Sequence, residues 1–401
     1  MAYRSVVVIG GGAAGAAITR ALAARGVGVT LLEKAGQLCS GATWHAAGLV
    51  TRFGGSPKLK KLHVRSLALL TEMHEAHDVG LHLTGSIRVI EKGHADRLLE
   101  AKHHVEMAAL YDDPALPTRL IGADEVAALH PLVDTSNVEA GVYTPEDGDI
   151  DPTLLTTCMA RLAKSDGATI RYNAEVDTVA RRDDGRFEVT LASAAGGERL
   201  VADAVVNAAG LWSTRFSRQL GMHHPAFVIE HQYAITETID AIAALPQGER
   251  VPVLRDLRGS SYLRQERQGL LIGPYEDAPV VKSAWREQDG PPDGWAWDLF
   301  QPDLDRLESC LLAGMELVPA LGDVGFASVI NGPTIWTGDS LPRCGRTDVP
   351  GCGFAREGTG RRRLARARER GSRPRRAPAP GTTTSTRSRT ASRTACRSRS
   401  T

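Results

Sequence analysis

The hydrophobic pattern near the N-terminus predicts a strand, a helix and a second strand, in that order. Residues 6–9 form a continuous apolar run rich in β-branched side chains, which is typical of a buried parallel strand. Ala14, Ile18 and Leu22 then recur at helical spacing until a glycine ends the pattern. Residues 27–32 form the next apolar run. This order indicates an α/β fold with a parallel sheet.

A glycine-rich turn joins the first strand to the helix and fits the pattern G-x-G-x-x-G. Gly10 permits the tight turn, Gly12 lets the backbone approach a pyrophosphate, and Gly15 lets the helix lie close to the strand. Ala13 opens the helix, whose N-terminal amides face the phosphates. The second strand ends at Glu33, which can accept hydrogen bonds from ribose hydroxyls. A fortuitous glycine turn would lack these neighbours, so we predict a bound dinucleotide, either NAD or FAD.

Length and composition narrow the class of protein. The 401 residues suffice for one large α/β enzyme or for two to three domains. No apolar run approaches the ~20 residues of a membrane span, and the first strand begins too early for a signal peptide. The cysteines form no CxxC pair or Cys/His cluster, so we expect reduced thiols, a cytoplasmic protein and no metal site. These are Cys39, Cys158, Cys310, Cys344, Cys352 and Cys396.

The segment after the ribose acid favours FAD. Residues 39–49 read Cys-Ser-Gly-Ala-Thr-Trp-His-Ala-Ala-Gly-Leu, and this run resembles the dimethylglycine/sarcosine dehydrogenase branch of the D-amino-acid-oxidase-like flavoproteins. In similar proteins its histidine is bonded to the 8α-methyl carbon of the flavin, a role that falls here to His45. A neutral imidazole is a nucleophile near neutral pH, and the flavin's quinone-methide tautomer is an electrophile; simple packing beside the flavin is the alternative. The resemblance implies further FAD contacts at Lys34, Gly41, Thr43, Trp44, Ala46, Gly48 and Leu49.

A second dinucleotide signature follows at residues 204–212, where an apolar strand leads into small residues that let the chain pass close to the cofactor. By resemblance, Val176 contacts the adenine through its backbone, and Gly210 and Trp212 lie at the flavin site. The resemblance covers roughly residues 5–354. It implies an α/β fold in which a Rossmann-like FAD-binding domain (1–78, 146–221 and 326–354) is interleaved with an antiparallel β-sheet substrate domain (79–145 and 222–325).

Residues 226–274 alternate apolar and polar positions, which predicts antiparallel strands over the flavin. Two runs there resemble family strands in which a histidine and a tyrosine face the flavin ring, here His231 and Tyr262. His231 would act as a base that keeps the substrate amine neutral, and Tyr262 would hydrogen-bond the substrate; satisfied polar residues on a sheet are the alternative. A substrate carboxylate would require a guanidinium, for which Arg88 and Arg264 are candidates.

The resemblance implies FAD-dependent oxidation of an N-methyl amino acid such as dimethylglycine or sarcosine. Hydride would pass from the N-methyl carbon to flavin N5, and the iminium would hydrolyse to formaldehyde and the demethylated amine. The electron acceptor would be oxygen or an electron-transfer flavoprotein, with no nucleic-acid or membrane partner. Similar dehydrogenases continue into a folate-binding half that this chain lacks. The pyruvate dehydrogenase phosphatase regulatory subunit resembles the same family, so a regulatory or catalytically impaired FAD-fold protein is the alternative.

Residues 355–401 differ sharply in composition from the rest. They carry 15 Arg and two Glu, a net charge of +13, whereas the remainder carries −12. With almost no apolar side chains, this basic tail is expected to be disordered. It stands where the family has a Gly-rich turn and a helix that faces the flavin. We therefore expect a changed reading frame that impairs activity; a basic arm for nucleic acid is the alternative.

Overall fold

The computed structural model describes residues 3–52, 57–193, 197–223, 226–275, 278–287, 290–338 and 341–356. The chain separates into two compact units, Met1–Arg362 and Arg363–Thr401, and every described residue belongs to the first. The predicted disorder and reading-frame change concern a tail of which all but residues 355 and 356 lies outside the described part of the chain.

A six-stranded sheet contains both dinucleotide signatures. Its strands are β1 (Ser5–Ile9), β2 (Gly28–Leu32), β8 (Thr169–Arg171), β12 (Ala204–Asn207), β18 (Arg343–Arg346) and β19 (Cys352–Arg356). Their order is β18-β19-β12-β1-β2-β8, and all neighbours from β19 to β8 run parallel, while β18 is antiparallel to β19. Val8 and Leu31 are fully buried, which confirms the interior strands predicted from the apolar runs.

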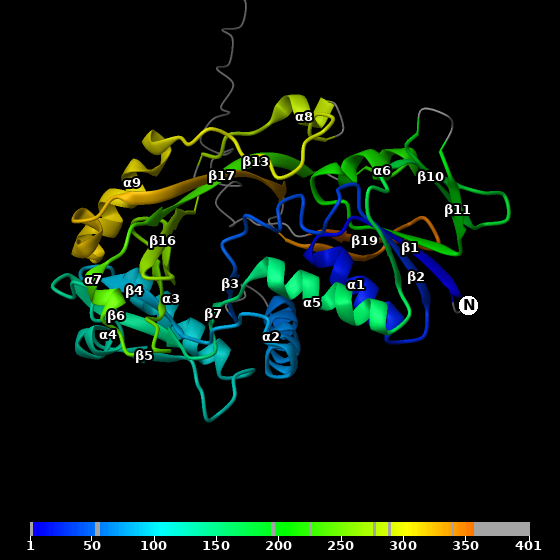
Figure 1. The fold of residues 1–401 in the computed structure, drawn as a ribbon. Helices are drawn as coiled ribbons and strands as arrows, with labels where there is room; N and C mark the ends of the chain where they lie inside the picture. The colour runs from blue at the N-terminus through cyan, green and yellow to red at the C-terminus, as the bar shows by residue number, and fades with distance from the viewer. Residues whose placement is uncertain are drawn as a thin grey trace, which may run out of the picture. The chain divides into compact units, whose positions relative to one another are not determined.

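Two helices cover this sheet side by side, α1 (Ala13–Ala23) and α5 (Pro152–Ser165) (Figure 1). Ala16, Ala160 and Ala163 share one buried cluster, and their small side chains let the helix axes approach closely. The side chain of Asp151 caps α5 by accepting from the amides of residues 153 and 154. Pro152 occupies the first turn, where the absence of an amide proton is tolerated.

A small antiparallel sheet of order β11-β10-β9 follows, built from β9 (Val176–Arg181), β10 (Phe187–Leu191) and β11 (Arg199–Ala202). Phe187 is fully buried against the six-stranded sheet's cluster. The chain then passes through η1 (Gly210–Trp212) into α6 (Ser213–Gln219).

The largest sheet has eight strands: β4 (Ser86–Glu91), β5 (Arg119–Ile121), β6 (Val138–Thr144), β13 (Ala226–Thr236), β14 (Val253–Asp256), β15 (Ser261–Glu266), β16 (Gly269–Pro274) and β17 (Phe326–Thr337). Their order is β17-β13-β16-β15-β14-β4-β6-β5, with β13 and β17 side by side along almost their whole length (Figure 1). The sheet is mixed rather than wholly antiparallel, because β14 and β4 are parallel.

The pairing of β17 departs from the predicted domain boundary. Residues 326–337 pair with β13 in the eight-stranded sheet, whereas the sequence analysis assigns segment 326–354 to the FAD-binding domain. Within that segment, β18 and β19 belong to the six-stranded sheet. The chain therefore passes from the eight-stranded to the six-stranded sheet after β17. The division into two interleaved domains stays a prediction.

The described part of the chain has seven further helices, which are α2 (Pro57–His77), α3 (Ala95–Ala108), α4 (Ala123–Leu129), α7 (Asp240–Ala243), α8 (Ser283–Glu287), α9 (Leu304–Leu317) and the 3₁₀ helix η2 (Pro319–Gly322). Helix α9 begins directly after Asp303, which caps it by accepting from the amide of Arg306. Leu307 and Cys310 of α9 pack on the eight-stranded sheet. None of the described helices has the length and hydropathy of a membrane span.

Two short strands connect the sheets. β3 (Leu49–Val50) pairs antiparallel with β7 (Gly148–Asp149), so the segment after His45 is held against the turn that leaves β6. Within the described part of the chain the cysteines are free, and no group of His, Cys, Asp and Glu could hold a metal ion.

Substitution of Gly15 tests the packing of α1 on β1. A Cβ on Gly15 would lie 1.9 Å from the carbonyl oxygen of Gly10, so Gly15→Ala should lower the free energy of unfolding by about 3 kcal/mol, the upper part of the overpacking range. Thermal and urea denaturation measure this. Gly122→Ala at the start of α4, where nothing lies within 4 Å, is the control. Equal melting of the two variants would contradict the packing argument.

Candidate functional site

The two dinucleotide signatures meet at Gly10. Its φ is +105°, and a Cβ there would lie 2.5 Å from the carbonyl oxygen of Ala208, at the end of β12. Glycine is required because both the backbone angle and the close approach exclude a side chain. The amide of Ala13 donates to Thr43 Oγ1 at 3.2 Å, which ties the first turn of α1 to the segment of residues 39–50, here called the flavin loop.

Glu33 at the end of β2 is buried and accepts three hydrogen bonds. The donors are the Gly11 amide at 2.7 Å, the Ala35 amide at 2.9 Å and Ser40 Oγ at 2.9 Å. A carboxylate has about four acceptor positions, so this arrangement leaves room for a ribose hydroxyl. The carboxylate also joins the glycine turn to the flavin loop.

The imidazole of His45 lies on the backbone of β17. A Cβ added to Gly332 would stand 2.4 Å from Cε1 and 2.5 Å from Nδ1 of His45, so the ring occupies the space above this glycine. His45 is 8% exposed, and the edge of its ring meets Trp44 at a centroid distance of 5.3 Å. Nε2 has no hydrogen-bond partner among the described residues.

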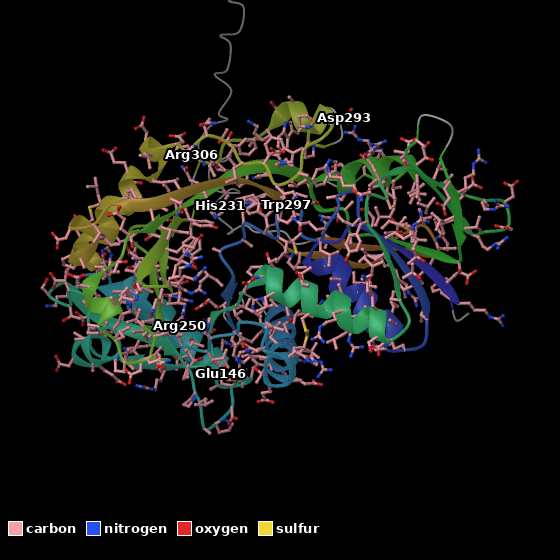
Figure 2. All side chains as sticks on the ribbon, viewed as in Figure 1. Glu146, His231, Arg250, Asp293, Trp297 and Arg306 are labelled. Carbon is pink, nitrogen blue, oxygen red and sulfur yellow. The ribbon has the colours of Figure 1, made fainter. Side chains whose placement is uncertain are left out.

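Burial keeps His45 neutral. Desolvation by burial, opposed in part by a hydrogen bond to its own backbone and aided by Coulomb repulsion from the nearby His231, lowers the pKa of His45 to about 4. His231 on β13 is the cross-strand partner of Gly332. The structure therefore brings together the two histidines that the sequence analysis singled out from distant segments. His231 is one of the residues labelled in Figure 2.

Tyr262 on β15 lies on the same sheet, over another glycine. A Cβ on its partner Gly273 would stand 2.4 Å from the Tyr262 hydroxyl. Tyr262 is 3% exposed, its ring centroid is 5.3 Å from that of Tyr275, and burial raises its pKa. Its hydroxyl therefore stays protonated and can donate a hydrogen bond. Tyr262 shares an apolar cluster with Ala47 and Leu49 of the flavin loop.

The two arginines proposed for a substrate carboxylate are both buried, but Arg264 is already engaged. Its Nε donates to the carbonyl oxygen of Ala47 at 2.7 Å, and Nη2 pairs with Glu266 at 2.7 Å. Arg88 stands on β4 as the cross-strand partner of a third arginine, Arg255. Arg264 is therefore better placed to hold the flavin loop than to bind a substrate carboxylate.

Arg255 on β14 is the residue that sequence reasoning missed. It is 7% exposed and is the cross-strand partner of Tyr262. Nη1 donates to the Tyr275 hydroxyl at 2.9 Å, whereas Nε and Nη2 have no hydrogen-bond partner in the described ranges. A buried guanidinium with donors to spare is suited to an anionic ligand. The available signal was an arginine that directly follows the apolar residues Val253 and Leu254.

Residues 290–300, which include Trp295, Trp297 and Phe300 and are here called the tryptophan strap, lie against the flavin loop. The Trp297 amide donates to the Ser40 carbonyl at 3.0 Å, and the rings of Trp297 and Trp44 are 5.8 Å apart. Lys34 Nζ stands 3.7 Å from the ring centroid of Trp212 and donates to the Trp295 carbonyl at 2.5 Å. Burial lowers the pKa of Lys34. Trp297 and Asp293 of the strap are labelled in Figure 2.

The remaining predicted residues lie near these groups. A Cβ on Gly48 would stand 2.2 Å from the carbonyl oxygen of Ile150, and its φ is +70°. A Cβ on Gly41 would stand 3.4 Å from the Trp212 ring, and Gly210 has a φ of +50°. Val176 is buried at the start of β9. Their contacts with a cofactor stay predictions, as do those of Gly12, Thr43, Ala46 and Leu49.

A buried ionic cluster holds Thr51 and Arg52, which directly follow the flavin loop. Asp147 is 1% exposed and accepts from the Arg52 amide at 2.6 Å, from Thr51 Oγ1 at 2.9 Å and from Ser86 Oγ at 2.7 Å. Arg52 also pairs with Glu146. These bonds join the loop to β4 of the eight-stranded sheet, and sequence reasoning gave no sign of them.

Known proteins resemble this chain over nearly its whole described length. Human dimethylglycine dehydrogenase is 39% identical over 84% of this chain and 38% of its own length. The formaldehyde-forming 4-methylaminobutanoate oxidase of Paenarthrobacter nicotinovorans is 33% identical over 85% of this chain and 39% of its own. The mouse pyruvate dehydrogenase phosphatase regulatory subunit is 26% identical over 87% and 38%. The chain thus spans about two fifths of the length of these curated relatives.

Among solved structures, L-proline dehydrogenase from P. horikoshii superposes with a TM-score of 0.75 at 25% identity, covering 89% of this chain and 88% of its own. Residues 5–362 match the DAO family, described as FAD dependent oxidoreductase. The match continues past residue 354, the limit suggested by the sequence motifs. Together with the paired dinucleotide signatures at Gly10 and β12, this match shows that the chain belongs to the DAO family of FAD dependent oxidoreductases.

Proposed function

We propose that this protein oxidises an N-methyl amino acid of the dimethylglycine or sarcosine type with FAD. One observation carries the proposal: the flavin loop meets the face of the eight-stranded sheet that bears His231, Tyr262 and Arg255. The relatives named for dimethylglycine and 4-methylaminobutanoate support the substrate class, since each of those substrates joins an N-methyl amine to a carboxylate.

The residues present fit FAD. Gly10 and Gly15 let β12 and α1 pack closely around the turn that would hold the pyrophosphate, Glu33 has room for a ribose hydroxyl, and Nε2 of His45 is a buried nitrogen for which the described residues provide no partner. A bound flavin supplies the acceptor for a hydride and, at its 8α-methyl carbon, an electrophile. We propose that His45 forms the covalent link, because its neutral imidazole retains a free lone pair.

Each side chain of the sheet face has a separate role in amine oxidation. Arg255 would bind the substrate carboxylate through Nε and Nη2, and Tyr262 would donate its hydroxyl proton to the substrate. His231 would take the proton of the ammonium form, since only a neutral amine gives up hydride. The C–H bond of the N-methyl group then breaks, and water adds to the iminium to release formaldehyde and the demethylated amine. Oxygen or an electron-transfer flavoprotein would take up the two electrons.

Covalent attachment is tested on the full chain incubated with FAD. Mass spectrometry of proteolytic peptides should find the flavin on the peptide that contains His45, and His45→Ala should release all flavin into acid. Because the pKa of His45 is lowered to about 4, the lone pair is present above this pH. The bond should therefore form at a constant rate between pH 6 and 8 and more slowly near pH 4. Yellow colour that leaves the wild-type protein wholly on acid precipitation would contradict the link.

Substitution of His231 distinguishes the proposed amine oxidation from the regulatory alternative. His231→Ala should slow anaerobic flavin reduction by dimethylglycine about 100-fold, the lower part of the range for general bases, with flavin content and melting temperature unchanged. His103→Ala, an exposed histidine on α3, is the control. If dimethylglycine and sarcosine fail to reduce the flavin even in the wild-type protein, the regulatory alternative is favoured.

Substitution of Arg255 tests recognition of the carboxylate. Arg255→Met should raise the half-saturating concentration of dimethylglycine about tenfold to a hundredfold, as expected for a lost charged hydrogen bond. The limiting rate of flavin reduction should change little. Reduction by N,N-dimethylpropylamine, which has no carboxylate, should be equal in both proteins. Arg258→Met, which removes a half-exposed guanidinium paired with Glu91, is the control. An unchanged half-saturating concentration would remove Arg255 from the site.

A further inference from the structure

Arg264 reaches from the eight-stranded sheet to the flavin loop. It lies on β15 two residues after Tyr262, so both side chains are on the same face of the sheet. The side chain of Arg264 is 10% exposed. Nε donates to the carbonyl oxygen of Ala47 at 2.7 Å. Ala47 stands two positions after His45, so this hydrogen bond from Arg264 holds the backbone close to the imidazole.

The rest of the guanidinium is fixed by groups of its own surroundings. Nη1 donates to the Gln265 carbonyl at 2.9 Å, and Nη2 pairs with Glu266 at 2.7 Å. Nη1 also lies 3.8 Å from Asp149. Because a guanidinium is planar, contacts at all three nitrogens set its orientation. A substrate carboxylate would have to displace one of these partners.

The flavin loop is also held directly after Ala47. The Ile150 amide donates to the Gly48 carbonyl at 2.8 Å, and Leu49 pairs with Asp149 across β3 and β7. Asp149 therefore lies close to Arg264 and also pairs with Leu49 of the flavin loop. His45 itself rests on Gly332 from the other side. The imidazole is thus confined between a fixed backbone and a glycine seat.

We propose that Arg264 is a positioning residue for covalent flavin attachment, which holds His45 on Gly332 so that Nε2 keeps its place relative to the flavin methyl carbon. This inference rests on the covalent link proposed above. In that step an N–C bond forms between Nε2 and the 8α carbon, and one C–H bond of the methyl group breaks. The addition leaves the ring system with two extra electrons, which dioxygen takes up with two protons as hydrogen peroxide.

The test follows the rate at which covalent flavin forms after FAD is added to the full-length apoprotein, measured as acid-stable absorbance of the precipitated protein. Arg264→Met keeps the side-chain stem but removes the donor, and Arg264→Lys keeps the charge without the planar geometry. Both should form the bond about tenfold or more slowly, as expected from losing a charged hydrogen bond. Non-covalent FAD binding, measured by fluorescence quenching, should persist.

Arg250→Met provides a matched control. Arg250 also donates to the Gln265 carbonyl, at 2.9 Å, and lies 3.4 Å from Asp149, and none of its hydrogen bonds or ion pairs within the described ranges involves the flavin loop. Figure 2 labels this residue. The control should attach flavin at the wild-type rate. Gly332→Ala, which displaces the imidazole from its seat, should slow attachment as Arg264→Met does, with thermal melting recorded for every variant.

Several results would overturn the proposal. Arg264→Met and Arg264→Lys could attach flavin at the wild-type rate, or Arg250→Met could be equally slow, which would indicate a general loss of stability. Normal attachment with a raised half-saturating concentration of dimethylglycine would make Arg264 a carboxylate ligand instead. A wild-type protein that never forms the covalent bond would contradict the inference. The proposed amine oxidation is tested separately, by whether the amine reduces the bound flavin.

Discussion

The contact between the imidazole of His45 and the backbone at Gly332 is the constraint on which the site depends. It joins the flavin loop, which follows the dinucleotide-binding strand β2, to the eight-stranded sheet that bears His231 and Tyr262. Because no side chain fits between the ring and β17, this position requires glycine. Arg264 and the pairing of β3 with β7 secure the same junction from the loop side.

Burial leaves His45 of the flavin loop and the groups on the facing sheet in different charge states. Desolvation favours neutral His45 and neutral Tyr262, whereas the guanidinium of Arg255 keeps its charge. The same environment therefore provides a nucleophilic nitrogen, a hydroxyl donor and a fixed cation. The proposed substrate, with an amine and a carboxylate, would match these groups, since its anionic end would offset the charge of Arg255 and its amine end would meet Tyr262 and His231.

The sequence predicted what depends on local motifs. The strand, glycine turn and helix around Gly10 follow from residues close together in the chain. The role of Arg255 could not be predicted in this way, because its neighbours depend on the parallel pairing of β14 with β4 and on the antiparallel pairing with β15. The pairing of residues 326–337 could not be predicted for the same reason, because the strand pattern does not reveal which sheet β17 joins.

The central claim is that FAD lies where the flavin loop meets the eight-stranded sheet. A crystal structure of the full chain loaded with FAD tests this most directly. The account predicts electron density for the isoalloxazine ring beside His45, continuous with Nε2, with its reactive face toward His231 and Tyr262. Density that places the ring away from Gly332 and this sheet face, or a dinucleotide bound elsewhere than at Gly10 and Glu33, would contradict it.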